Sequence, residues 1–79
     1  MSEQARQPHY SMIIEWSDEE NVYIVSFPEW GHLAHTHGST YAEAVRHGQE
    51  VIELLTESAI EHGETLPQPS VFGNRVKSV

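Results

Sequence analysis

One segment of the chain, residues 39–63, restricts the fold more than any other. Successive helical residues are about 100° apart, and on that wheel eight mostly apolar residues of this segment fall within an arc of about 120°, the width of a core-facing stripe. They are Tyr41, Ala44, Val45, Gly48, Val51, Ile52, Leu55 and Ala59. The opposite side carries Glu43, Glu50, Glu53, Glu57 and Glu61. The pattern predicts a long amphipathic helix over residues 40–62 with an acidic outer edge.

Both ends of this predicted helix carry capping signals. Ser39 or Thr40 can serve as the N-cap, and Thr40 and Glu43 have the spacing of a capping box. Gly63 suits the left-handed position that follows a helix, and two prolines further on prevent its continuation. We therefore expect Ser39, Thr40 and Glu43 to cap the helix.

The residues before the helix predict a small antiparallel sheet. Segments 9–16 and 22–27 are rich in β-branched and aromatic residues, and they flank the polar turn SDEEN, as in a hairpin. Pro28 and Gly31 interrupt the second strand, and LAHTH at 33–37 predicts a short third strand. The expected fold class is α+β: a three-stranded antiparallel meander with one long helix packed on one face.

With 79 residues, the chain has room for one domain. We expect a disordered tail over 1–8, a domain over 9–69, and a C-terminal arm or fourth short strand over 70–79. One helix can cover only one face of the sheet, and an exposed apolar face usually marks an interface. Small domains often need disulfides or self-association, and the chain has no cysteine. We therefore expect a homo-oligomer, a dimer or a tetramer.

Charge and hydropathy bound the partners and the location of the protein. Twelve acidic and four basic residues give a net charge of −8 with histidines neutral, which repels nucleic acid and favours a basic partner. No apolar run approaches the roughly 20 residues that span a bilayer, and the polar opening MSEQARQPH is unlike a secretory signal. We expect a cytoplasmic protein without membrane contact.

Three histidines, His32, His35 and His37, form the set with metal-ligand chemistry, because His-x-His on a strand places both imidazoles on one face. No carboxylate is specifically placed as a further ligand. We expect no metal and no other cofactor, and these histidines remain the alternative metal site. Most acids crowd one helix edge and one turn instead of converging in a cleft, and no serine lies in a nucleophile elbow. We therefore expect no catalytic residues.

The order of these features resembles the HicB-like family of type II antitoxins over residues 10–69. The matching elements are the hairpin with its acidic turn, FPE leaving the second strand, THGSTYAEA opening the helix and HGETLPQP closing it. The resemblance implies a partly degraded ribonuclease-H-like fold without nuclease catalysis. It also implies a partner, a small basic HicA-like toxin that cleaves mRNA and whose active site the antitoxin covers.

Two departures from the family pattern bear on this expectation. Gly38-Ser39-Thr40 stands where the family commonly has Gly-Asp-Thr, and serine can still cap a helix. Many family members continue into a DNA-binding segment, whereas this sequence ends about ten residues after PQP. We therefore expect a short stand-alone member that does not bind DNA directly.

The predicted function is that of a noncatalytic antitoxin-like protein that binds and neutralises a HicA-like toxin. Charge complementarity and aromatic anchoring are assigned to the predicted interface residues Glu43, Glu50, Glu53, Glu57, Tyr23 and Trp30. The alternatives are an orphan homo-oligomeric structural or regulatory protein and a metal-dependent enzyme that uses the three histidines.

Overall fold

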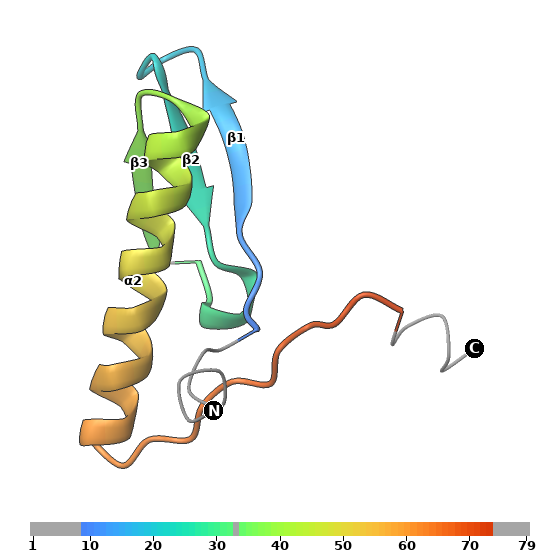
Figure 1. The fold of residues 1–79 in the computed structure, drawn as a ribbon, viewed down its shortest axis with the longest axis vertical. Helices are drawn as coiled ribbons and strands as arrows, with labels where there is room; N and C mark the ends of the chain where they lie inside the picture. The colour runs from blue at the N-terminus through green and yellow to red at the C-terminus, as the bar shows by residue number, and fades with distance from the viewer. Residues whose placement is uncertain (1–8, 33, 74–79) are drawn as a thin grey trace.

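A computed structural model describes residues 9–32 and 34–73, in which three strands are followed by one long helix (Figure 1). The elements are β1 (Ile13–Ser17), β2 (Val22–Ser26), the 3-10 helix η1 (Pro28–Trp30), β3 (His35–Gly38) and α2 (Tyr41–Glu61). The strands form one antiparallel sheet in the order β1-β2-β3. The predicted α+β architecture, a meander with a helix on one face, is confirmed. The expected tail over 1–8 lies outside the described residues.

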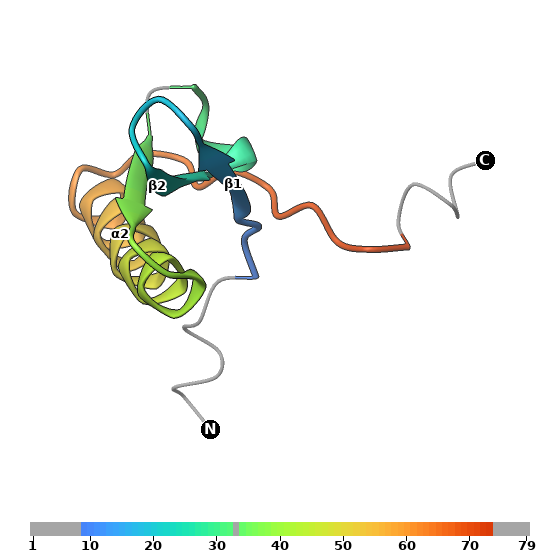
Figure 2. The same cartoon turned by 90° about the horizontal axis from the view of Figure 1, so that it is seen from above.

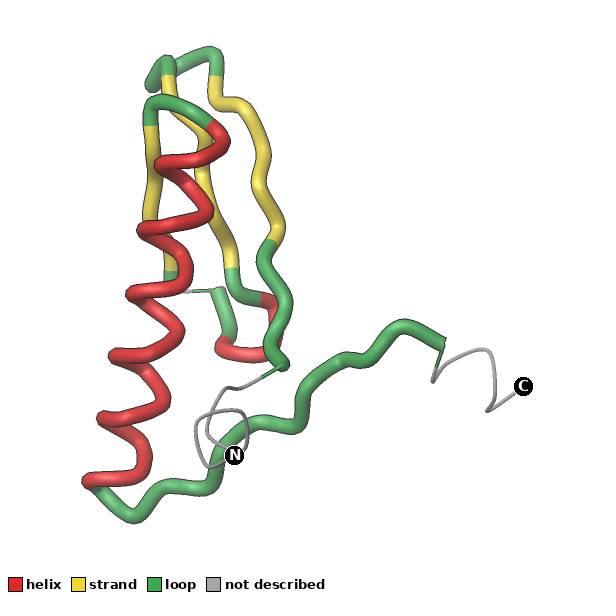
Figure 3. Tube along the Cα trace, viewed as in Figure 1, coloured by secondary structure: helices red, strands yellow, loops and turns green. Residues whose placement is uncertain are grey.

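β1 is shorter than its sequence pattern predicts, because it begins at Ile13 instead of near residue 9 (Figure 3). Ile13 pairs with Ser26, so an extension of this register would place Ser11 opposite Pro28. Proline has no backbone N–H to donate to a ladder, and the chain turns into η1 at that residue. The backbone N–H of Ser11 donates instead to the Glu29 carboxylate, at 3.1 and 3.3 Å.

The core lies between α2 and one face of the sheet. Val25 and Phe27 are fully buried and pack against Ala44 and Ile52 of the helix. Partly buried apolar residues surround this cluster: Tyr10, Met12, Ile14, Tyr23, Trp30, Ala34 and Val51. The side chains that alternate onto one face of the strands therefore pack against the apolar stripe that recurs every 3.6 residues along the helix.

Two glycines set how closely the layers approach. A Cβ at Gly38 would lie 2.5 Å from the backbone nitrogen of Ala44, so β3 and the first turn of α2 meet backbone to backbone. A Cβ at Gly48 would instead meet the sulfur of Met12, the far end of a flexible side chain. The contact between β3 and α2 at Gly38 can therefore adjust less than the contact at Gly48.

Tyr41 departs from the predicted core stripe, since 62% of its surface is exposed. It is the first residue of α2, beyond the apolar cluster around Val25 and Phe27. Its ring stacks on Tyr23 of β2, with ring centroids 4.4 Å apart. A helical wheel treats the stripe as uniform, whereas here its first residue lies beyond the buried part.

The helix is longer than the strands that it covers. A helix of 21 residues is about 31 Å long, whereas a strand of five residues spans about 17 Å. The C-terminal half of α2 therefore extends past the sheet, as Figure 1 shows. Gly63, at φ 68°, follows the helix, and the bonds from Gly63 N to Ile60 O and from Glu64 N to Ala59 O form a Schellman motif.

The segment after the helix runs back beneath the sheet and then away from the body (Figures 1 and 3). The Tyr10 hydroxyl donates to the Pro67 carbonyl at 2.7 Å, and Ser70 N donates to Glu29 Oε2 at 2.9 Å. Residues 70–73 of the predicted arm form no strand. Residues 74–79, the rest of the possible fourth strand, lie outside the described residues.

The second face of the sheet is not covered by α2. Figure 2, the view from above, shows that the helix lies on a single side of the sheet. Register places Glu15, Ile24 and His37 in one row across this face, with Ile13, Ser26 and His35 in the next. Ile13 is 44% exposed. This face mixes apolar and polar side chains instead of forming one apolar patch.

Candidate functional site

The predicted acidic edge of α2 is present as a row of carboxylates. Glu50, Glu53, Glu57 and Glu61 are all exposed. Within residues 9–32 and 34–73 the only Lys or Arg is Arg46, against eleven of the twelve Asp and Glu residues of the chain. The described part of the molecule therefore presents a strongly negative field.

Glu43 has a separate role from the rest of this row. Its Oε1 accepts a hydrogen bond from Ser39 N at 2.6 Å, while Glu43 N donates to the Thr40 hydroxyl at 3.1 Å. Thr40 is the N-cap, so the carboxylate reaches one residue before the cap. The hydrogen bond from Ser39 is the main cause that holds the pKa of Glu43 below its ordinary value. Glu43 therefore fixes the start of the helix.

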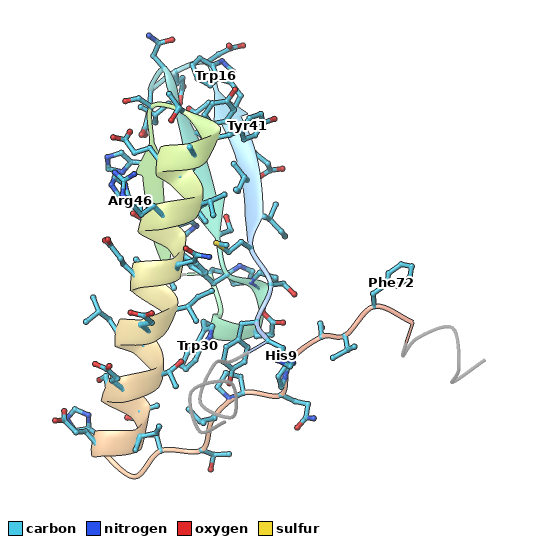
Figure 4. The ribbon with its side chains drawn as sticks, in the orientation of Figure 1. His9, Trp16, Trp30, Tyr41, Arg46 and Phe72 are labelled. Carbon is cyan, nitrogen blue, oxygen red and sulfur yellow. The ribbon has the colours of Figure 1, made fainter. Side chains whose placement is uncertain are left out.

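The two predicted aromatic anchors lie at opposite ends of the domain, and neither joins the acidic edge. Tyr23 is half-buried. Tyr41 stacks on its face, and Trp16 lies edge-on to it, with the Trp16 and Tyr23 ring centroids 5.0 Å apart. Trp30 is half-buried against Tyr10 at 5.3 Å, and its buried indole N–H has no hydrogen-bond partner within the described residues. Figure 4 shows Trp16 and Tyr41 at one end and Trp30 near the other.

The exposed aromatic residues at the upper end were not among the predicted site residues. Trp16 is 48% exposed, and its indole N–H donates to Asp18 Oδ1 at 2.8 Å. The turn that carries Asp18 is closed on Ser17, whose hydroxyl accepts from Glu20 N and whose carbonyl accepts from Asn21 N. The sequence signal was the polar turn beside an aromatic strand end, which indicates a hairpin but does not specify the contact between Trp16 and Asp18.

Glu29 was also not among the predicted site residues, although its carboxylate joins three segments. Its carboxylate accepts from the backbone and hydroxyl of Ser11 and from the backbone of Ser70. Burial raises the pKa of Glu29, but the hydrogen bonds from Ser70 and Ser11 outweigh it and hold this pKa below its ordinary value. Burial and the nearby Glu29 charge raise the pKa of Tyr10. Glu29 is therefore a structural link between the sheet and the C-terminal segment.

The histidines of the alternative metal site do not form a ligand set. His35 and His37 are exposed on the second sheet face, and His32 is exposed beyond η1. Among residues 9–32 and 34–73, no group of three or more His, Cys, Asp or Glu side chains is arranged to hold a metal ion. The geometry of the described residues therefore gives no support to the metal-dependent alternative.

Exposed apolar side chains also occur on the part of α2 that extends past the sheet. Leu54 and Ile60 line a shallow open hollow together with Glu57, Ser58 and Glu61. These residues place apolar surface directly beside the acidic edge. An apolar centre beside a polar rim is the usual arrangement of a protein interface.

Comparison with protein-family models, curated proteins and solved structures finds no match to this chain. Among the described residues, no helix has the length and apolar character needed to cross a membrane.

Proposed function

We propose that this chain is a noncatalytic, antitoxin-like binding protein that neutralises a small basic HicA-like mRNA-cleaving toxin in the cytoplasm. The observation that carries the proposal is the exposed acidic edge of α2, formed by Glu50, Glu53, Glu57 and Glu61. Complementary charge accelerates the encounter with a cationic partner and suppresses the wrong partners. The resemblance of residues 10–69 to HicB-like antitoxins supplies the class of partner.

Two further features support this binding role. The acidic edge adjoins Leu54 and Ile60, which are 64% and 62% exposed, so a docked protein can bury apolar surface beside the charges. The edge also lies on a single helix whose start is capped and whose end is closed by a Schellman motif. A rigid element loses little conformational entropy when it binds.

The test is co-purification with the product of the adjacent gene, followed by an mRNA-cleavage assay. We expect a stable complex and loss of cleavage at equimolar protein. In a double variant with Glu53→Gln and Glu57→Gln, two interface charges worth about 0.7 kcal/mol each would weaken binding about tenfold. The defect should shrink at high salt, because salt screens exposed charges.

The matched control removes the same net charge elsewhere, by Glu15→Gln together with Glu19→Gln. Both residues are exposed and lie outside α2. The control should bind the toxin within about twofold of the parent protein, since screening weakens charges more than about 8 Å away. Equal losses of affinity in the two double variants would show that binding depends on net charge alone and not on the acidic edge of α2. A toxin that is neither bound nor inhibited would refute the function for that pair.

Self-association is a second candidate role, alone or beside toxin binding, and exposed apolar residues away from α2 favour it. Ile13 is 44% exposed on the uncovered sheet face, and Phe72 is 97% exposed on the C-terminal segment (Figure 4). Sedimentation equilibrium should give a dimer or tetramer that Ile13→Glu or Phe72→Ser dissociates. A monomer over the whole concentration range would refute this role and leave toxin binding intact.

A further inference from the structure

The upper end of the domain carries three aromatic rings in contact, Trp16, Tyr23 and Tyr41, which we call the aromatic end. Tyr23 forms its centre, with Tyr41 stacked on one side and Trp16 edge-on against it. The two outer rings keep 48% and 62% of their surface exposed. They come from β1, β2 and the first residue of α2, so three elements fix the position of the rings.

A carboxylate is fixed beside these rings. Asp18 Oδ1 accepts the indole N–H of Trp16 at 2.8 Å, and Asp18 is otherwise exposed. Its turn is closed by the backbone N–H of Asn21, which lies in the left-handed region at φ 62° and donates to the Ser17 carbonyl at 2.7 Å. An aromatic face and a carboxylate edge therefore stand next to each other in a defined arrangement.

The charge around the aromatic end is negative. Asp18, Glu19 and Glu20 follow one another on the turn. Arg46, the only Lys or Arg within the described ranges 9–32 and 34–73, lies on the other side of α2 from Tyr41 (Figure 4), about 140° around the helix. No cation of the described residues therefore competes for these rings, and an anionic ligand such as nucleic acid is repelled.

We propose that the aromatic end and Asp18 bind the guanidinium group of an arginine side chain presented by the basic partner. A guanidinium stacks on aromatic faces and donates two parallel hydrogen bonds to a carboxylate, which a lysine ammonium cannot do. The inference rests on the proposed binding of a basic protein. It adds a second contact surface, separate from the acidic edge of α2, and names the side chain that this surface selects.

The two tryptophans allow a direct test with the full chain. In a proton–nitrogen correlation spectrum each indole N–H gives one signal, and Trp16→Phe assigns them. The probe is the peptide Arg-Gly-Arg-Gly-Arg, and its lysine counterpart is the comparison. We expect the arginine peptide to shift the Trp16 signal while the buried Trp30 signal stays in place, and to bind about three- to fivefold more tightly than the lysine peptide.

Matched variants distinguish binding at this site from the effect of losing any charge or any exposed apolar side chain. Asp18→Asn and Glu19→Gln each remove one charge from the same turn, and only Asp18 contacts Trp16. Tyr41→Ala and Val71→Ala each remove an exposed apolar side chain, 62% and 47% exposed, and Val71 lies on the C-terminal segment, outside α2. We expect a loss of about three- to fivefold for Asp18→Asn and Tyr41→Ala, and less than about twofold for Glu19→Gln and Val71→Ala.

Three outcomes would overturn the inference. Equal losses for Asp18→Asn and Glu19→Gln would reduce it to electrostatics. A larger Trp16 shift with oligothymidylate than with the arginine peptide would assign the rings to a nucleobase. A Trp16 signal that moves with protein concentration alone would assign them to a second copy of the chain. If the toxin itself does not bind while the peptide selects arginine at Trp16, the antitoxin function fails and the arginine site stands.

Discussion

Two aromatic pairs with a neighbouring carboxylate occupy the two ends of this domain, and they differ in what the carboxylate binds. At the upper end, Trp16 lies edge-on to Tyr23 at 5.0 Å and donates to Asp18, two residues away. At the lower end, Tyr10 lies edge-on to Trp30 at 5.3 Å. There, Glu29 accepts backbone N–H groups 18 and 41 residues away in the sequence.

The difference shows that the same side-chain types can be structural or available for binding. A carboxylate whose acceptor positions are filled by distant backbone groups joins segments of the fold, and its removal leaves those donors without a partner. A carboxylate held only by its neighbour leaves acceptor capacity for a ligand. Glu29 is the first case and Asp18 the second.

The largest effect expected at the upper end comes from Gly38→Ala. The added Cβ would collide with the backbone of Ala44, so the first turn of α2 must move away from β3 at a cost of about 1–3 kcal/mol. Tyr41 begins that turn, and Tyr23 pairs with Gly38 in the sheet, so the stack of the two rings should open. Urea unfolding measures the stability, and near-ultraviolet circular dichroism measures the packing of the rings.

The control for this variant is Gly48→Ala. Its Cβ meets the flexible end of Met12 and lies 3.3 Å from Cγ1 of Val25, without touching backbone, and alanine favours a helix by about 1 kcal/mol over glycine, so its effect should be smaller. A Gly38→Ala variant as stable as the Gly48→Ala variant would show that β3 and the first turn of α2 move apart at little cost. The aromatic end would then be less rigid than the stack of Tyr23 and Tyr41 indicates.

At the lower end, Glu29→Gln should destabilise the protein by about 1–2 kcal/mol, because one acceptor oxygen for Ser11 and Ser70 is lost. Folding lowers the pKa of Glu29, so its contribution is complete above the unfolded-state pKa of about 4.3 and is lost as pH falls through the lower folded-state pKa. The stability difference between parent and variant should therefore disappear in acid.

Urea unfolding at a series of pH values measures this difference. Glu64→Gln is the control, since Glu64 is exposed to solvent after the helix, and it should change stability by less than about 0.5 kcal/mol. A Glu29 effect that persists unchanged below pH 3 would contradict the role of the ionised carboxylate.

The smallest effect on stability is expected for Asp18→Asn, less than about 0.5 kcal/mol. Asp18 is exposed, and an amide oxygen in its place can still accept the indole N–H of Trp16. Thermal unfolding compares it with Glu29→Gln. A loss as large as that of Glu29→Gln would place Asp18 among the structural carboxylates and remove the contrast between the two ends.

Much of the fold was predictable because its signals are local. The 3.6-residue period, the capping residues and Gly63 predicted a helix over 40–62, and α2 spans Tyr41–Glu61. Alternation along the predicted second strand places Val25 and Phe27 on the same side, and both are fully buried. Each of these features depends on residues within a few positions of one another.

The long-range contacts at the two ends were not predictable, because they join positions far apart in the sequence. Nothing in the sequence near Glu29 indicates Ser70 as a partner, and nothing near Tyr10 indicates Pro67. Tyr41 fits the apolar stripe of the helix, and its exposure follows only from where the core ends along α2. Trp30 was predicted as an interface anchor on its residue type, and the structure places it half-buried beside Tyr10.

The order of the elements along the chain also bears on how the protein folds. Each element packs mainly on its neighbour in sequence, β1 on β2, β2 on β3 and β3 on α2. Such local connectivity favours rapid folding. The bonds from Tyr10 to Pro67 and from Ser70 to Glu29 close much longer loops. On the ribosome, β1, β2 and β3 can therefore pair as they emerge, and the C-terminal segment fastens last, once residue 70 has left the exit tunnel.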